Sequence, residues 1–201
     1  MGEYLAAMPP DVRENTIFLA VSDHGEDIYG RGARLESYHI ENARVPCWLY
    51  VPRRVQERLR PGAVENLRAN CQNRATSSID LLPTVLDLMG LARKQPVAEI
   101  LGRLQGRSLL DAREPSEFIL MLNTNDLRHW EREGFALTMD NGTWRYLYDM
   151  GRRSLYNLQD DPREERDLID DPVAAPYLGR VQERVANCPY LLRIVRKYEG
   201  G

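Results

Sequence analysis

The chain has 201 residues, of which 43% are hydrophobic and 28% charged, and its formal net charge is −3. This length fits one domain, or one domain with a small appendage, and the apolar content suffices for a folded core. The net charge argues against a nucleic-acid binder, which would carry a basic patch. No stretch reaches the roughly 18 apolar residues of a membrane-spanning helix. Residues 1–10 also lack the basic start and apolar core of a secretory signal peptide.

The cysteines, Cys47, Cys71 and Cys188, are odd in number and widely spaced. This pattern predicts neither a disulfide framework nor a zinc motif, and we expect buried free thiols. Free thiols favour a reducing compartment such as the cytoplasm, although a periplasmic location stays open for the intact protein.

The first part of the chain predicts two buried strands on either side of a polar loop. A short helix over residues 3–13 precedes an apolar strand over residues 16–22. Residues 25–37 are polar and contain three glycines, which is typical of a loop. A second apolar run, residues 45–51, predicts another buried strand that Pro52 ends.

Residues 80–89 predict a helix, which follows an Arg-rich surface helix or loop over residues 55–70. Asp80 can serve as its N-cap, and Gly90 can end it. Its apolar residues recur at helical spacing and predict one core-facing stripe: Leu82, Val85, Leu86 and Met89.

After Arg113 the pattern changes to short strands. The turn sequence Asp140-Asn141-Gly142 predicts a hairpin between strands over residues 134–139 and 143–149. We expect further strands over 117–122 and 154–158 and closing helices over 173–187 and 189–198. The sequence therefore predicts an α/β part over residues 1–115 and, over residues 116–201, a small subdomain of antiparallel strands and closing helices.

The most informative motif is Ser-Asp-His-Gly-Glu at residues 22–26, directly after the first predicted strand. In open α/β sheets, ligands bind beyond the carboxyl ends of the strands. The Asp23 carboxylate and the His24 imidazole together suit a divalent metal that accepts oxygen and nitrogen ligands. Gly25 would let the chain turn sharply after them. Taken alone, the pair also has a plainer interpretation, in which Asp23 caps a turn and His24 is a surface imidazole.

Three further segments, residues 41–46, 76–90 and 154–168, strengthen the metal interpretation. Together with residues 22–26 they resemble the C-terminal half of the sulfatases, in order and in rough spacing, over about residues 10–170. The sulfatases belong to the alkaline-phosphatase-like superfamily, whose other members include phosphonate monoester hydrolases and phosphoethanolamine transferases. The resemblance implies part of an alkaline-phosphatase-like α/β sandwich, with a small C-terminal antiparallel sheet plus helices.

The resemblance also implies roles for individual residues. Asp23 and His24 would bind the catalytic metal, which neutralises charge on the sulfuryl or phosphoryl group and activates the nucleophile. The imidazole ligand favours manganese or zinc, with calcium as the alternative. Members of the family often place a Lys or His after this motif to contact the ester oxygens or protonate the leaving group, and His39 is the candidate here. Arg31 and Arg34 in the same loop could clamp an anion.

The sequence also departs from the sulfatase pattern. In the family the N-terminal half supplies the nucleophile and further metal ligands, and the 22 residues before Asp23 are too few to be that half. No cysteine lies in the Cys-x-Pro-Ser-Arg context of the family's modified nucleophile. Two ligands alone seldom hold a metal tightly.

We therefore expect the C-terminal portion of a metal-dependent sulfuric or phosphoric ester hydrolase that is inactive alone. In the intact protein its substrate would be a small-molecule or lipid-linked sulfate or phosphate ester. The alternative is a stand-alone, non-catalytic sulfatase-like domain with a binding role. An exposed sheet edge could also pair two copies into a homo-oligomer under either interpretation.

Overall fold

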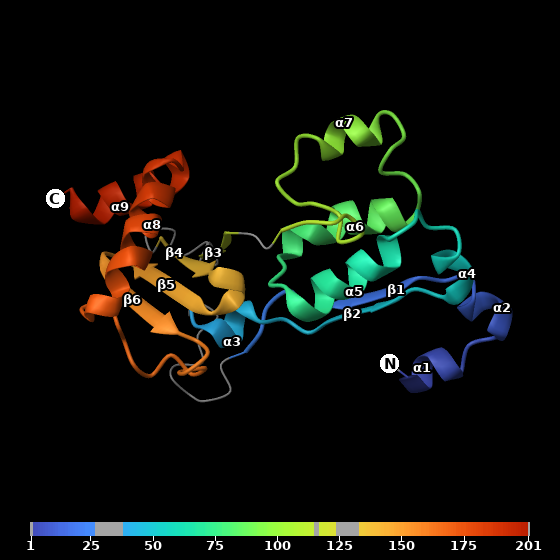
Figure 1. Ribbon diagram of the computed structural model, residues 1–201, viewed down its shortest axis with the longest axis horizontal. Coiled ribbons are helices and arrows are strands. Elements are labelled where there is room, and N and C mark those ends of the chain that lie inside the picture. The colour runs from blue at the N-terminus through green and yellow to red at the C-terminus, as the bar shows by residue number, and fades with distance from the viewer. Residues whose placement is uncertain (1, 27–37, 115–116, 124–132, 201) are drawn as a thin grey trace. The chain divides into compact units, whose positions relative to one another are not determined.

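The computed structural model describes residues 2–26, 38–114, 117–123 and 133–200, and the chain divides into two compact units (Figure 1). The first unit consists of Met1–Ser22 and Pro46–Pro115. The second consists of Asp23–Val45 and Ser116–Gly201. The segment that follows the first strand therefore packs with the C-terminal part of the chain, which matters for the candidate site.

The first unit begins with two short helices, α1 (Gly2–Ala6) and α2 (Pro10–Arg13), where the sequence predicted one. The break between them falls at the two consecutive prolines. Pro10 occupies the first turn of α2, where its missing N–H is not needed, but it could not continue α1.

The two predicted strands are present as β1 (Phe18–Val21) and β2 (Cys47–Tyr50), which pair antiparallel. The expected burial was wrong, because neither strand contains a fully buried residue. Val21 is 42% and Trp48 53% exposed. An apolar run predicts a strand, but burial also requires a layer on each face, and the described residues do not enclose these two strands.

The helices of the first unit are α4 (Arg53–Gln56), α5 (Ala63–Asn73), the 3₁₀ turn η1 (Ser78–Asp80), α6 (Leu81–Leu88) and α7 (Val97–Leu101). The core of this unit is small and contains the buried side chains of Val51, Ala63, Leu88 and Leu110. A cavity of about 620 Å³ lies between β2 and helices α5 and α6, so packing here is incomplete.

The helix predicted over residues 80–89 is present, but its stripe does not face the core. Leu82 is 55% and Met89 60% exposed, whereas Pro83, Thr84 and Leu88 are buried. This short helix is apolar on more than one side, so the spacing alone did not decide which side packs. Gly90 does follow the helix with a left-handed φ of 70°.

Contrary to the prediction from the sequence, Asp80 does not cap helix α6 with its side chain. It makes no side-chain cap bond to α6. Its buried carboxylate instead accepts hydrogen bonds from the backbone N–H of Ser77 at 3.1 Å and of Arg107 at 3.0 Å. One of its oxygens also lies 3.1 Å from Nη1 of Arg113. Asp80 thus ties three segments of the first unit together.

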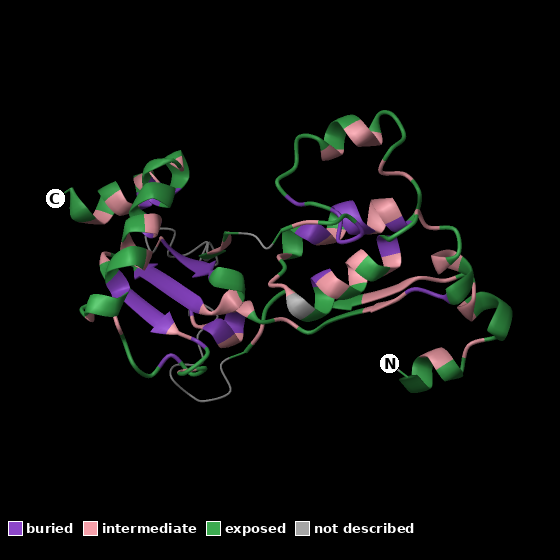
Figure 2. Ribbon diagram, viewed as in Figure 1, coloured by how far each residue is buried: buried purple, intermediate pink, exposed green. Residues whose placement is uncertain are grey.

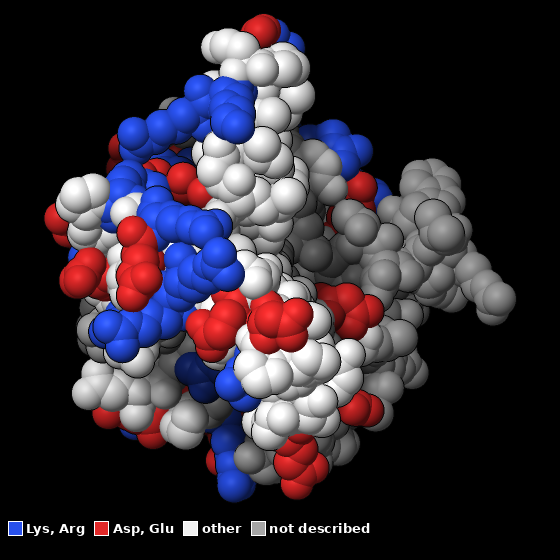
Figure 3. Space-filling model, turned by 90° about the vertical axis from the view of Figure 1, so that its right-hand side faces the viewer, with Lys and Arg blue, Asp and Glu red and all other residues white. Residues whose placement is uncertain are grey.

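The face drawn in Figure 3 carries Lys and Arg side chains in a band with Asp and Glu beside them. Two exposed arginines of the first unit are paired with a glutamate four residues away, Arg53 with Glu57 at 3.1 Å and Arg103 with Glu99 at 2.6 Å. Such exposed pairs contribute little stability, and we assign these arginines no site.

The second unit is built on one antiparallel sheet in the order β3-β4-β5-β6. Its strands are β3 (Phe118–Asn123), β4 (Gly134–Met139), β5 (Trp144–Asp149) and β6 (Arg152–Asn157). The predicted hairpin is confirmed, since β4 pairs with β5 across Asp140–Gly142. All three turn residues have positive φ, of 49°, 56° and 96°, a conformation that Asp, Asn and Gly tolerate best.

Both faces of this sheet are covered, and β4 is buried along its whole length (Figure 2). Alternate residues of a strand point to opposite faces. Phe135 and its same-face neighbours pack in a cluster with Val181 of α8 (Ala175–Ala186) and Leu191 of α9 (Pro189–Glu199). These are the two closing helices that the sequence predicted. On the opposite face, Ala136 packs in a cluster with Ile40 of α3 (Ile40–Ala43).

The predicted mixed α/β architecture with a small antiparallel sheet and helices is confirmed. All three cysteines are free, as expected, but the predicted burial was wrong: Cys47 and Cys71 are exposed and Cys188 is half-buried. Within the described residues, no helix is both long and apolar enough to cross a membrane.

Candidate functional site

Asp23 and His24 lie directly beyond the end of β1, and both are exposed. The closest described approach between their charged ends joins His24 Nε2 and Asp23 Oδ2 at 3.8 Å. The other ring nitrogen of His24, Nδ1, lies 2.6 Å from the carbonyl oxygen of Gly25. A carbonyl can only accept, so Nδ1 carries the hydrogen, and Nε2 is the nitrogen left for a metal.

Gly25 is required by close packing rather than by a turn, because its φ is not positive. Its N–H donates a hydrogen bond to the carbonyl oxygen of Asn42 at 2.9 Å. A Cβ at this position would lie 1.8 Å from the carbonyl oxygen of Glu41 and 2.7 Å from that of Arg44. The motif therefore lies directly against α3, at a distance that only glycine permits.

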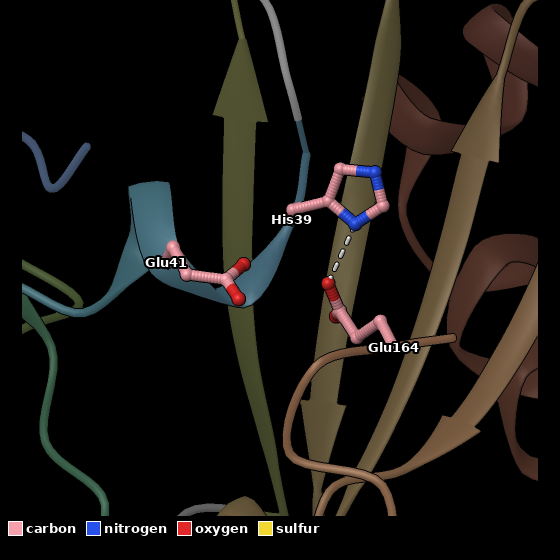
Figure 4. Close-up of side chains that lie close together, drawn as sticks. All are labelled: His39, Glu41 and Glu164. Carbon is pink, nitrogen blue, oxygen red and sulfur yellow. Dashed lines mark hydrogen bonds and ion pairs between the residues drawn. The ribbon is translucent and has the colours of Figure 1, made fainter. Parts of the chain in front are cut away.

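Helix α3 is held in turn by the loop that follows β6. His39 precedes the helix, and its Nδ1 lies 2.8 Å from Oε2 of Glu164 (Figure 4). The backbone N–H of Ile40 donates to the same oxygen at 2.9 Å. The Glu164 side chain is fully buried, while that of His39 is 26% exposed.

Arg145 of β5 supplies the opposite charge. Its Nε lies 3.1 Å from Oε1 of Glu164, and it donates to the Thr138 hydroxyl at 2.7 Å and to the Tyr38 carbonyl at 2.6 Å. Burial lowers the pKa of Arg145 to about 10, and the neighbouring Glu164 carboxylate opposes that shift. The guanidinium therefore stays charged at neutral pH.

Among the described residues, His39, Glu41 and Glu164 form the only group of three whose potential ligand atoms all lie within 4.8 Å of one another (Figure 4). We do not assign a metal to this group. Oε2 of Glu164 already accepts from two donors, and Arg145 lies beside the other oxygen. A cation there would face the guanidinium and displace those donors.

The Asp23–His24 pair fits a metal better. Metal–ligand bonds of about 2.0–2.2 Å allow one ion to bridge atoms up to about 4 Å apart, and the two ligand atoms here are separated by 3.8 Å. The hydrogen bond from Nδ1 to a backbone carbonyl is the usual support of a metal-binding imidazole. The pair offers two ligands, and further ligands would have to come from other residues.

The structure brings only some of the predicted site residues together. Asp23 and His24 are adjacent, whereas the described contacts of His39 lead to Glu164. Arg31 and Arg34 lie outside the described residues.

The sequence interpretation missed Glu164 and Arg145. Arg145 could have been found, because an arginine within a buried strand requires a charged partner. Glu164 offered no comparable signal, since it lies in an acidic segment where most carboxylates are exposed.

Comparisons with known proteins bear on this geometry. The sulfatase family model matches residues 7–91. An uncharacterized sulfatase of Escherichia coli, YidJ, is 26% identical over 187 residues, which is 85% of this chain and 31% of that protein. A choline-sulfatase of Rhizobium meliloti is 26% identical over 164 residues, 79% of this chain and 28% of that protein. The chain thus spans about a third of the length of these relatives.

Solved structures agree on the fold. A putative sulfatase from Bacteroides thetaiotaomicron superposes with a TM-score of 0.66 at 18% identity, covering 100% of this chain and 41% of that one. A 2-O GAG sulfatase superposes with a TM-score of 0.62 at 19% identity, covering 99% of this chain and 40% of that one. The resemblance drawn from the sequence motifs is confirmed: the chain is similar to sulfatases in sequence and in fold.

Proposed function

We propose that the chain is part of a metal-dependent sulfuric ester hydrolase, with phosphoric esters as the alternative substrate class. The exposed pair of Asp23 and His24 at the end of β1 carries the proposal, because its donor atoms and their separation suit one divalent ion. The similarity to sulfatases supports the reaction class.

In this proposal a carboxylate oxygen of Asp23 and Nε2 of His24 hold the ion. When bound, such an ion neutralises charge on the sulfuryl or phosphoryl group and activates the nucleophile. Manganese or zinc is favoured over calcium because one of the ligands is an imidazole. The nucleophile and the remaining ligands would belong to other parts of the intact protein, and this chain alone would be inactive.

The chain's own contribution beyond the two ligands is His39. Its ring is partly exposed and held through Nδ1, so Nε2 is the atom that could act on an ester oxygen, donating to it when the ring is protonated. Arg31 and Arg34 remain candidates for contacts with the anionic ester.

A calorimetric titration with manganese, zinc and calcium tests the metal site. Wild-type protein should bind manganese or zinc in the micromolar range and more tightly than calcium. The double variant Asp23→Ala/His24→Ala should lose that binding. Asp11→Ala, which removes an exposed carboxylate elsewhere, should bind like the wild type. Equal binding by the double variant, or calcium bound most tightly, would contradict the proposal.

A second candidate function is assembly, either as a stand-alone binding domain or as a homo-oligomer. The observation in its favour is the exposed apolar surface of the first unit, at Val21 and Trp48 on the strands and at Leu82 and Met89 on and after α6. Light scattering over a dilution series tests it. A monomer at every concentration would contradict the homo-oligomer.

A further inference from the structure

Residues 154–168 are one of the four segments that carry the family resemblance, but they have no role in the proposed chemistry. Within them, Glu164 has a φ of 54°, a left-handed conformation that is unfavourable for a residue other than glycine. Such a backbone persists only where the surrounding contacts define it. The contacts in this case include those of the buried carboxylate and a hydrogen bond from the N–H of Glu164 to the carbonyl oxygen of Asp161 at 3.2 Å.

We propose that Glu164 is a positioning residue for the candidate site: its carboxylate fixes His39 in the tautomer that carries hydrogen on Nδ1, and it anchors the helix against which the Asp23–His24 motif lies. This proposal rests on the proposed function for its catalytic meaning, but its physical content can be tested without any reaction.

The first part follows from the donor and acceptor inventory. An ionised carboxylate can only accept hydrogen bonds, so the 2.8 Å contact requires hydrogen on Nδ1 of His39. Arg145 supplies the compensating charge on the other carboxylate oxygen. In the neutral ring the lone pair is then on Nε2, which Figure 4 shows on the side of the ring away from Glu164. A carboxylate that selects the tautomer of a histidine in this way is a recurring device in hydrolase sites.

The anchoring of α3 follows from two hydrogen bonds that the backbone of this helix connects. Glu164 accepts from the N–H of Ile40, the first residue of α3. Within the same short helix, the carbonyl of Asn42 accepts from the N–H of Gly25, the residue after His24. Helix α3 therefore links the buried carboxylate, through one hydrogen bond at each end, to the backbone that carries the proposed metal ligands.

A purely structural ion pair between Arg145 and Glu164 would explain the burial of both groups, but it would leave the tautomer of His39 unspecified. Nitrogen NMR of the histidine rings separates the two explanations. The chain has only three histidines, so His39→Gln identifies the signals of interest.

At a pH where the ring is neutral, we expect His39 of the wild type to carry its hydrogen on Nδ1. Glu164→Gln should reduce that preference, because either orientation of the amide leaves its NH₂ group facing a hydrogen-bond donor. Glu165→Gln, which changes the exposed neighbouring carboxylate, should leave the tautomer unchanged.

A second variant covers the case in which Glu164→Gln does not fold. In Arg145→Met/Glu164→Met the buried pair is replaced by apolar side chains of similar volume, an exchange that is often tolerated. The carboxylate that accepts from Nδ1 of His39 is then gone, and the Nδ1 preference should disappear. Hydrogen on Nε2 in the wild type, or an unchanged Nδ1 preference in the double Met variant, would overturn the proposal.

The proposed function and the positioning role of Glu164 can be contradicted separately. A correct tautomer together with no metal binding would remove the proposed function and leave the positioning of His39 intact. Metal binding that depends on Asp23 and His24, together with hydrogen on Nε2 of His39, would contradict the positioning role of Glu164 and leave the proposed function intact.

Discussion

The two units use apolar strands in opposite ways. In the second unit, β4 is buried along its length because α8 and α9 cover one face and α3 covers the other. In the first unit, β1 and β2 are equally apolar but contain no fully buried residue. Strand burial therefore depends on the layers that cover a sheet as much as on the sequence of the strand. Substitutions in the second unit should therefore have the larger effects.

The largest effect is expected at the buried ion pair. Glu164→Ala should lower the free energy of unfolding by about 3–5 kcal/mol, because it leaves the guanidinium of Arg145 buried without its carboxylate. Glu165→Ala, an exposed neighbour, should change it by less than about 0.5 kcal/mol. Urea unfolding measures both, with hydrogen exchange assigning the transition to the second unit. Equal effects would mean that Glu164 is not buried as described.

Leucine truncations compare the two units directly. Leu155 of β6 is fully buried, and Leu155→Ala should cost about 2–5 kcal/mol through lost contacts and a residual cavity. Leu82→Ala in the first unit should cost under about 1 kcal/mol, because that side chain is 55% exposed. Similar costs in thermal or urea unfolding would show that Leu82 is covered in solution, as the assembly candidate requires.

Alkaline pH should destabilise the second unit. Burial raises the pKa of Tyr38 and Tyr146, and the negative charge of Asp149 raises that of Tyr38 further. Below pH ~10 both phenols are neutral whether the chain is folded or unfolded, so stability is unaffected. Above it the unfolded chain releases protons that the folded chain keeps, and stability falls by about 1.4 kcal/mol per pH unit for each group. Tyr146→Phe should reduce this slope in alkaline unfolding, and an unchanged slope would exclude a contribution from Tyr146.

The smallest changes in stability are expected when alanine replaces glycine at two positions. Gly179 is an exposed position of α8 with no atom within 4 Å of a Cβ, so Gly179→Ala should stabilise by about 0.5–1 kcal/mol. Gly90 follows α6 with a φ of 70°, so Gly90→Ala should destabilise by about 1–2 kcal/mol. Thermal unfolding gives the sign of each change, and the same sign at both positions would contradict the described backbone.

The sequence predicted where most strands lie and where the hairpin turns, because these depend on local composition. Asp140-Asn141-Gly142 is an example, since three residues that tolerate positive φ define the turn by themselves. Burial of β1 and β2 could not be predicted, because it depends on residues far away in the chain.

For the site, the sequence predicted Asp23 and His24 as candidate ligands, and this assignment stays a prediction. It did not predict the contact of His39 with Glu164, because 125 residues separate the two and only the folded sheet brings them together. It also misinterpreted Gly25, whose role is close contact with α3 rather than a turn.

We propose that the metal binds at Asp23 and His24 rather than at the cluster of His39, Glu41 and Glu164. Addition of zinc to the chain labelled with ¹⁵N at histidine tests it directly by NMR. We expect the ring signals of His24 to shift strongly and those of His39 to keep their positions. A shift at His39 with none at His24 would contradict it and would place the ion in the cluster beside Glu164.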